Sequence, residues 1–186
     1  MKGFVNGGYI DDTMTLTRVS LESGIFGLDG NDTISVNDSR VKLAVSGEKG
    51  NDVININNNS VVEWDVCGDA GDDTITINGG SVEGNIDGGT GNDKYIISAI
   101  GSNEKYTIYQ CSTNEDDIDT LVINAKRGEF SFSGWYNSGY PLTLTNKSLG
   151  TIIEIDGWTY CPLSNIQFTD VTLDMSQIEV AADLSN

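Results

Sequence analysis

The stretch GLDGNDTISV at residues 27–36 joins a glycine-rich turn to a short β-branched run, and it decides the fold because it recurs. Related stretches begin at Gly47 (GEKGNDVINI), Gly68 (GDAGDDTITI) and Gly88 (GGTGNDKYII), at steps of 20, 21 and 20 residues. A single copy is typical of a β-hairpin turn. Four copies at a nearly constant step indicate one structural unit that is repeated along the chain.

The repeat fades at both ends. Twenty residues before Gly27, the stretch GGYIDDTMTL begins at Gly7 and places Asp12 in register with Asp32. After a longer interval, IDTLVIN places Asp119 in the same register. The unit therefore extends beyond its four clear copies in a degenerate form.

Apolar residues recur at fixed positions of each unit and alternate with polar residues, which predicts strands with one buried face. Each unit is expected to hold two short strands and two turns. A meander of antiparallel hairpins has no reason to keep like residues at a fixed step, whereas a parallel solenoid stacks them about 4.8 Å apart. The pattern therefore favours a parallel β-solenoid. The columns are Met14/Ile34/Ile54/Ile75/Tyr95, Leu16/Val36/Ile56/Ile77/Ile97, Leu21/Val41/Val62/Val82 and Ile25/Val45/Val66/Ile86.

Charge and composition exclude several classes of function. The chain has 186 residues and a formal net charge of −18, which repels nucleic acid and anionic lipid, so neither is an expected partner. It contains no histidine, which excludes Ser-His-Asp, Cys-His and HExxH sites within the chain. No apolar run of about 18 residues exists, so no membrane insertion is predicted. The N-terminal stretch lacks the apolar segment of a cleavable signal peptide.

The remaining chemistry-bearing residues do not form a catalytic pattern. Cys67, Cys111 and Cys161 are widely spaced and form no CxxC pair, which argues against zinc. One disulfide with a free thiol and three separate thiols both fit the sequence. Three arginines lie in no common register, which argues against a calcium-dependent lyase; they are Arg18, Arg40 and Arg127. We therefore predict that the chain is not an enzyme.

Stacking the turns places Asp32, Asp52, Asp73 and Asp93 in a line, each about 5 Å from the next. Such a row repels itself by about 1 kcal/mol per pair unless cations lie between the carboxylates. The glycines permit positive φ, so backbone carbonyls can turn toward the same cations. An oxygen-only shell of this kind suits calcium better than zinc, copper or magnesium. The alternative is that these residues only cap turns.

The turns resemble a known family. GGTGNDKYI at residues 88–96 matches the nonapeptide GGxGxDxUx in full, and Leu28, Glu48 and Asp69 replace only its second glycine in the other turns. Residues 27–178 are similar to the RTX (repeats-in-toxin) haemolysin-type calcium-binding family. The resemblance implies an all-β fold, a right-handed parallel β-roll of about 20 residues per coil that a C-terminal antiparallel β cap closes.

The resemblance also implies a set of calcium ligands. The opposite turns lack the GxD pattern, so three ions are expected along one edge, between the successive pairs of Asp32, Asp52, Asp73 and Asp93. Asp119 would add a fourth ion, although the preceding NEDDID contains no glycine, and Ile10 argues against a further ion at Asp12. The expected backbone carbonyl ligands are those of Gly27, Asp29, Gly47, Lys49, Gly68, Ala70, Gly88 and Thr90.

Three segments are expected: a degenerate N-terminal coil (1–26), the calcium-binding roll (27–118) and a capping segment (119–186) that includes a possible type I secretion signal, EVAADLSN. The cap should contain a strand in DTLVIN, a hairpin of 142–145 with 151–156, a second hairpin around Thr169 and a short helix from about Met175. Four aromatic residues should fill the cap, with a sugar-stacking platform as the alternative; they are Trp135, Tyr136, Trp158 and Tyr160.

The predicted function is therefore a monomeric module that folds on binding calcium, as the C-terminal part of a secreted bacterial RTX protein. The resemblance implies an extracellular location and the type I secretion machinery as a partner. The main alternative is an extracellular adhesin or a polysaccharide-binding accessory module. The outward positions Lys42, Glu63 and Glu83 show no repeated aromatic column, which argues against this alternative.

Overall fold

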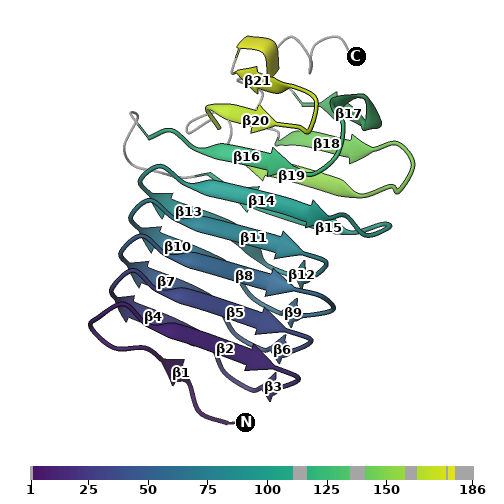
Figure 1. Cartoon of the computed structure of the whole chain (residues 1–186). Helices are drawn as coiled ribbons and strands as arrows, with labels where there is room; N and C mark the ends of the chain where they lie inside the picture. The colour runs from purple at the N-terminus through teal and green to yellow at the C-terminus, as the bar shows by residue number, and fades with distance from the viewer. Residues whose placement is uncertain (1, 111–116, 135–140, 158–162, 175, 179–186) are drawn as a thin grey trace.

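The computed structural model describes residues 2–110, 117–134, 141–157, 163–174 and 176–178. They form a stack of coils that runs from the N-terminus at one end to the cap at the other (Figure 1). Several sequence predictions lie outside the described residues: those on Cys111 and Cys161, on the four aromatic residues Trp135, Tyr136, Trp158 and Tyr160, and on the C-terminal EVAADLSN.

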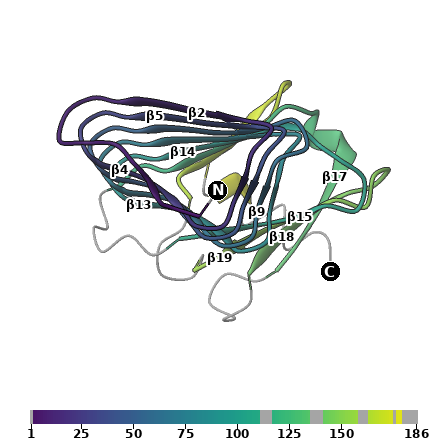
Figure 2. The same cartoon turned by 90° about the horizontal axis from the view of Figure 1, so that it is seen from below.

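Each of the first four coils has three sides, and each side contributes one strand to a parallel sheet. Figure 2 looks along the stack and shows this outline. Sheet A contains β1 (Val5–Asn6), β4 (Ile25–Asp29), β7 (Val45–Lys49), β10 (Val66–Ala70) and β13 (Asn85–Thr90). Sheet B contains β2 (Thr13–Thr17), β5 (Thr33–Asn37), β8 (Val53–Asn57), β11 (Thr74–Asn78) and β14 (Lys94–Ala99). Sheet C contains β3 (Ser20–Leu21), β6 (Arg40–Val41), β9 (Val61–Val62) and β12 (Ser81–Val82).

The strand register confirms the columns that the sequence predicts. Ile54 pairs with Ile34 on one side and Ile75 on the other, and Ile75 pairs with Tyr95. These four side chains are at most 1% exposed, and they stack along the axis of the roll. Burial of such apolar columns is the main favourable contribution to folding. The parallel β-roll is therefore confirmed.

The expected two strands per coil prove to be three. Val41 and Val45 belong to two of the predicted columns, but they lie in different strands: Val41 ends β6, a bend follows at 42–43, and Val45 begins β7. The same division recurs in the neighbouring coils, because the chain turns a corner between the short side and sheet A. The first half of the glycine-rich turn that begins at Gly47, residues 47–49, therefore belongs to β7.

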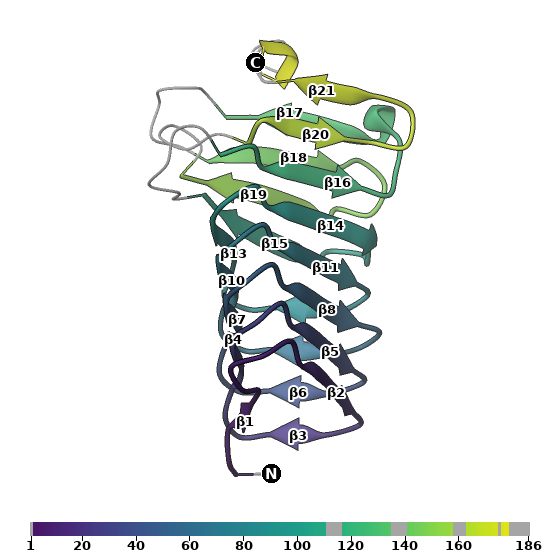
Figure 3. The same ribbon diagram turned by 60° about the vertical axis from the view of Figure 1, so that its left-hand side comes forward.

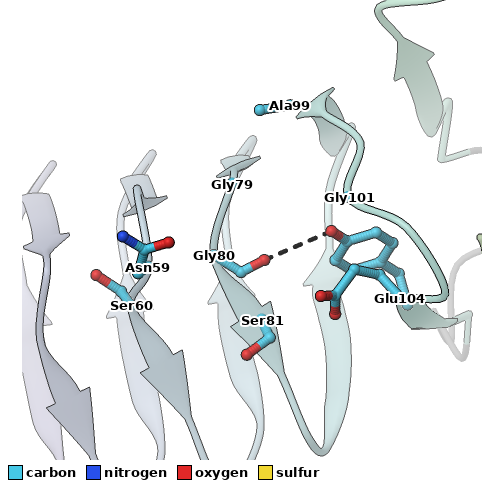
Figure 4. Close-up of a pocket in the computed structure, with 9 residues that line it drawn as sticks. Asn59, Ser60, Gly79, Gly80, Ser81, Ala99, Gly101 and Glu104 are labelled. Atoms are coloured by element: carbon cyan, nitrogen blue, oxygen red, sulfur yellow. Dashed lines mark hydrogen bonds between the residues drawn. The ribbon is translucent and has the colours of Figure 1, made fainter.

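The fifth coil lacks the short third side. After β14 the chain passes directly to β15 (Lys105–Tyr109), which pairs with β13, so that sheet C ends at β12. The missing strand leaves a cavity of about 240 Å³ beside Ser60, Gly80 and Glu104 (Figure 4). The hydroxyl of Tyr106 donates to the Gly80 carbonyl across 3.5 Å, in the place where a further strand would donate its N–H.

The cap continues both large sheets and then reverses strand direction. In sheet A, β19 (Ile152–Asp156) is parallel to β15 and is followed by the antiparallel β18 (Leu142–Asn146) and β17 (Phe130–Ser133). In sheet B, β16 (Thr120–Ile123) is followed by β20 (Asn165–Gln167) and the antiparallel β21 (Thr172–Asp174), as Figure 3 shows. A 3-10 turn, η1 (Arg127–Glu129), precedes β17.

The predicted elements of the cap are confirmed where the structure describes them. These are the strand in DTLVIN, the two hairpins and a short helix, which covers residues 176–178. Antiparallel strands cover the edges of the last parallel coil, and such coverage limits edge-to-edge aggregation. Within the described residues, no helix has the length and apolar character needed to cross a membrane.

Candidate metal centre

Each glycine-rich turn carries the chain from sheet A to sheet B and ends in an aspartate just before the sheet B strand. We call the resulting column the aspartate ladder; it contains Asp12, Asp32, Asp52, Asp73, Asp93 and Asp119. The four central members, which follow the four clear turns, are 1–2% exposed. A row of buried carboxylates therefore lies along one edge of the roll.

One carboxylate oxygen of each aspartate is used to join the coils. The backbone N–H of Asp32 donates to Oδ1 of Asp52 at 2.7 Å, and that of Asp52 donates to Oδ1 of Asp73 at 2.7 Å. The same bond, 2.7–2.9 Å long, links each of the other neighbouring pairs from Asp12 to Asp119. Because the aspartates recur at the step of the repeat, these hydrogen bonds form a continuous chain from Asp12 to Asp119.

The second oxygen has no such partner. The Oδ2 atoms of Asp32, Asp52, Asp73 and Asp93 are buried and accept no hydrogen bond. None of the ion pairs that the described residues form involves these carboxylates. A buried carboxylate oxygen without a partner is costly, so these four atoms require a cation or a proton.

The first glycine of each turn makes room for this oxygen. A Cβ added at Gly68 would collide with Oδ2 of Asp73 and would lie 2.6 Å from the carbonyl oxygen of Gly88. Gly27 has the same surroundings, with Oδ2 of Asp32 and the carbonyl oxygen of Gly47. Carboxylate and carbonyl oxygens of neighbouring coils therefore converge beside each of these glycines.

The other predicted carbonyls lie in the same turns, and most also join the coils. The N–H groups of Gly30, Gly50 and Gly71 donate to the carbonyls of Lys49, Ala70 and Thr90, each at 2.9 Å. A carbonyl oxygen has two lone pairs, so this bond leaves one available for a cation. Asp29, whose carbonyl completes the predicted set, pairs with Lys49 in sheet A.

Left-handed backbone at the second turn position explains why glycine is favoured there. The φ angles of Leu28, Glu48 and Asp69 are 82°, 75° and 77°, while Gly89 in the fully matching turn has φ of 98°. A side chain in this region is strained. The three non-glycine residues therefore keep the conformation of the turn but strain its backbone.

Burial disfavours the charged form of four carboxylates of the aspartate ladder. Burial raises the pKa of Asp73 to about 8, that of Asp93 to about 7 and that of Asp119 to about 6. Burial also raises the pKa of Asp52, and the charge of Asp32 adds to the effect. The hydrogen bond to Oδ1 opposes these shifts without cancelling them. Without a cation, Asp73 and Asp93 therefore bind protons near neutral pH.

The donor set suits a hard cation. Every candidate ligand atom is an oxygen, and the chain contains no histidine. Cys67 precedes Gly68, but burial raises the pKa of its thiol to about 12, so it is not a thiolate at neutral pH. In the part of the chain that the structure describes, no group of three or more His, Cys, Asp or Glu side chains converges on one metal position. Backbone carbonyls must therefore supply much of any shell, and the glycine-rich turns place them where this is possible.

Sequence reasoning missed three residues at the last turn. The Tyr95 hydroxyl accepts the N–H of Gly88, the Gln110 side chain donates to the same hydroxyl, and Asp117 accepts the N–H of Gly91. The column pattern predicts only an apolar role for Tyr95. The hydroxyl of Tyr95, in a column otherwise filled by Ile and Met, is the sequence feature that could have indicated a polar contact there.

Asp12 belongs to the ladder although Ile10 replaces a glycine. Its N–H donates to Oδ1 of Asp32, and the Gly27 carbonyl approaches Gly7 as in the later turns. Oδ2 of Asp12 is, however, not among the buried oxygens without a partner. The first turn thus has the backbone of the repeat without its buried unpaired oxygen.

Comparisons with known proteins add little to this geometry. No family model matches the chain, and no curated protein matches it. Among solved structures, the chain is similar to the extracellular lipase LipA from Serratia marcescens, with 13% identity and a TM-score of 0.29. The match covers 84% of this chain but only 38% of the lipase chain. A likeness at this TM-score supports no conclusion about the function of the chain.

Proposed function

We propose that the chain is a calcium-dependent folding module of the RTX type that binds ions in a single row along the aspartate ladder. The observation that carries this proposal is the row of four buried Oδ2 atoms without partners, two of which meet a carbonyl oxygen from the next coil beside a glycine. Three ions fit the gaps between Asp32, Asp52, Asp73 and Asp93. The role is structural and not enzymatic.

Calcium binding supplies the free energy that the apo fold lacks. The chain has a net charge of −18 and buries a row of like charges, and both features oppose compaction. A cation that binds only the folded state stabilises that state by mass action. Three divalent ions would neutralise six of these charges, and the coils would close on one another.

This dependence fits a secreted protein. Extracellular calcium modules bind their ions with Kd values of about 10⁻⁴ to 10⁻³ M, so they remain empty in the cytosol and fill outside the cell. We propose that the module folds after export by the type I secretion machinery and works as a monomer outside the cell. The resemblance of its turns to the RTX nonapeptide supports this assignment.

Circular dichroism of the full chain at neutral pH tests the proposal. The calcium-depleted protein in chelator should show the spectrum of a largely disordered chain, and millimolar calcium should produce the β spectrum. Magnesium at the same concentration is the matched control and should have little effect, because it retains its waters. The same β spectrum in chelator and in calcium would contradict the proposal.

A further inference from the structure

Sheet C ends at an open edge. Its last strand, β12, pairs with β9 on one side, and among the described residues no strand follows it on the other. In the coil below, the Val62 carbonyl accepts the N–H of Glu83 from the next coil at 2.9 Å. Val82 is in register with Val62, so its carbonyl points toward a strand that sheet C does not have. The Gly80 carbonyl, on the same edge, accepts the Tyr106 hydroxyl across a long 3.5 Å.

A groove runs along this edge, and we call it the β12 groove. Its two walls are formed by residues 79–84 and residues 99–107. One part is the cavity of about 240 Å³ that Figure 4 shows, and a second part of about 440 Å³ continues along β12. Ser81 and Glu104 line both parts, so the two cavities form one groove. All of the residues that line it belong to the described chain.

The cap holds this groove open. Residues 100–104 connect β14 to β15, and they bond to the hairpin of β18 and β19 instead of following β12. The N–H of Asn103 donates to the Leu149 carbonyl at 2.9 Å, and the Thr151 hydroxyl donates to the Gly101 carbonyl. Closing the groove would break these bonds. A preformed groove binds its ligand at a lower ordering cost than one that must open.

The inward column of sheet C indicates what fits the groove. Leu21, Val41 and Val62 are fully buried, whereas Val82, the last member of the column, is 4% exposed and lines the groove. A further parallel strand would cover Val82 with an apolar side chain and donate N–H groups to the open carbonyls. Addition of an extended peptide to a sheet edge is a common mode of peptide recognition.

The charges along the groove favour a basic peptide. Glu83 and Glu104 line it, and Glu104 takes part in none of the ion pairs of the described residues, which include all ten Lys and Arg residues of the chain. Lys105 also lines the groove, but its ammonium group pairs with Glu154 at 2.8 Å. The net charge of −18 attracts a basic partner from a distance as well.

A strand with the required chemistry already exists in the second coil. Its sequence is Arg40-Val41-Lys42, in which Val41 covers Leu21 of the coil below. The ammonium group of Lys42 pairs with the carboxylate of Glu22 in the same lower coil, 2.5 Å away. Glu83 is the last member of the column that contains Glu22 and Lys42, so an added basic residue would find the same kind of partner there.

We propose that the β12 groove binds an extended basic segment of a partner protein, which adds one parallel strand to sheet C. An apolar residue of this segment covers Val82, and the Lys or Arg residues on either side of it pair with Glu83 and Glu104. The inference requires only the folded roll and does not depend on which ion occupies the aspartate ladder.

An NMR titration of the folded, isotope-labelled full chain tests the proposal. The probe is the acetylated and amidated peptide SRVKLA, which has the sequence of residues 39–44. Amide signals of residues 79–84 and 104–107 should shift saturably, with a Kd of about 1 mM or below. The same peptide with N-methyl groups on its arginine and lysine lacks the two N–H donors and should not bind. Absence of a saturable shift with SRVKLA, or equal affinity of the methylated peptide, would overturn the inference.

Variants of the groove carboxylates test the choice of a basic partner. Glu83→Gln and Glu104→Gln should each raise the Kd about twofold to fivefold, as expected for a partly exposed ion pair. Glu22→Gln, at the opposite end of the same column, is the matched control and should leave the Kd unchanged. The charge-reversed peptide SEVELA should not bind. Equal affinities of the two peptides, or shifts confined to the first coil, would contradict the assigned site.

Discussion

The backbone N–H of Asp52 donates to Oδ1 of Asp73, 2.7 Å away, while Oδ2 of Asp73 is buried without a hydrogen-bond partner. The two oxygens of one carboxylate thus have different roles. Oδ1 joins neighbouring coils by accepting a hydrogen bond, and an amide oxygen could accept the same bond. Oδ2 is buried without a partner and requires a cation or a proton, which is the basis of the proposed calcium dependence.

Asp73→Asn separates these two roles. The amide retains an Oδ1 acceptor but places an NH₂ group where the cation is expected, so the calcium concentration at the folding midpoint should rise about tenfold or more. Circular dichroism during a calcium titration measures this midpoint. The neighbouring residue offers a matched control, because Asp72 is exposed and its column contains asparagine in other coils, at Asn31, Asn51 and Asn92.

Asp72→Asn should shift the midpoint by less than about twofold, since a surface charge contributes little. The asparagine keeps the side-chain oxygen that accepts the N–H of Asn92. Equal shifts in D72N and D73N would mean that general charge reduction, and not a defined ion site, controls folding.

Gly68→Ala tests the space for the ion. The added Cβ would collide with Oδ2 of Asp73 and press on the Gly88 carbonyl, so the turn must move and the calcium midpoint should rise. Gly128→Ala is the control, because a Cβ there meets no atom within 4 Å. G128A should match the wild type in the same calcium titration. A normal midpoint in G68A would show that no ion lies beside Gly68.

The repeating part of this fold could be predicted from the sequence because each column has one residue type and one environment. Ile34, Ile54 and Ile75 pair as the step of about 20 residues predicts. The third side of each coil was missed, because β6 and β9 contain only two residues each and such short runs carry no detectable period.

The contacts of Tyr95 at the last glycine-rich turn were also missed, for a different reason. Tyr95 fits the apolar pattern of its column, and its hydroxyl accepts the N–H of Gly88 just beyond the point where the pairing of β13 with β15 ends. Gln110, the other partner, is 15 residues away in the sequence. Contacts that arise where a repeat stops have no counterpart elsewhere in the chain, so periodicity cannot reveal them.

Ile54→Ala should destabilise the calcium-loaded module by about 2–5 kcal/mol, because it leaves a cavity in the central column of the roll. Ile54 is fully buried between Ile34 and Ile75. Denaturant unfolding in saturating calcium measures the change. Val53→Ala, at an adjacent residue that is 38% exposed, should change stability by no more than about 1 kcal/mol. A loss in V53A as large as that in I54A would contradict the assigned strand face.

Acid should partly substitute for calcium. Burial raises the pKa of Asp73 to about 8 and that of Asp93 to about 7, whereas both have the ordinary aspartate pKa in the unfolded chain. At pH values between the ordinary pKa and these raised pKa values, the folded metal-free state therefore binds more protons than the unfolded state. Stability of the metal-free fold should therefore increase as the pH falls through this window and decrease as it rises. Calcium-stripped protein should show more β signal at about pH 5 than at about pH 9.

The Asp73→Asn/Asp93→Asn variant provides the control for this pH effect. Neither amide titrates, so the difference in β signal between the two pH values should become smaller in the calcium-stripped double variant. A pH response equal to that of the wild type would assign the effect to the net charge of −18 instead of to the ladder.

Cys67 should report on calcium-dependent folding through its reactivity. It lies in β10 beside Asp65, Asp69 and Asp87, and burial, with a smaller effect of these charges, raises the pKa of its thiol to about 12. Because the thiolate is the reactive form, Cys67 should resist iodoacetamide at about pH 8 in calcium and react readily in chelator, where the unfolded thiol has a pKa of about 8.5. A Cys111→Ser/Cys161→Ser variant isolates the signal, and mass spectrometry of the alkylated chain measures it. Equal labelling rates in calcium and in chelator would mean that calcium does not bury β10.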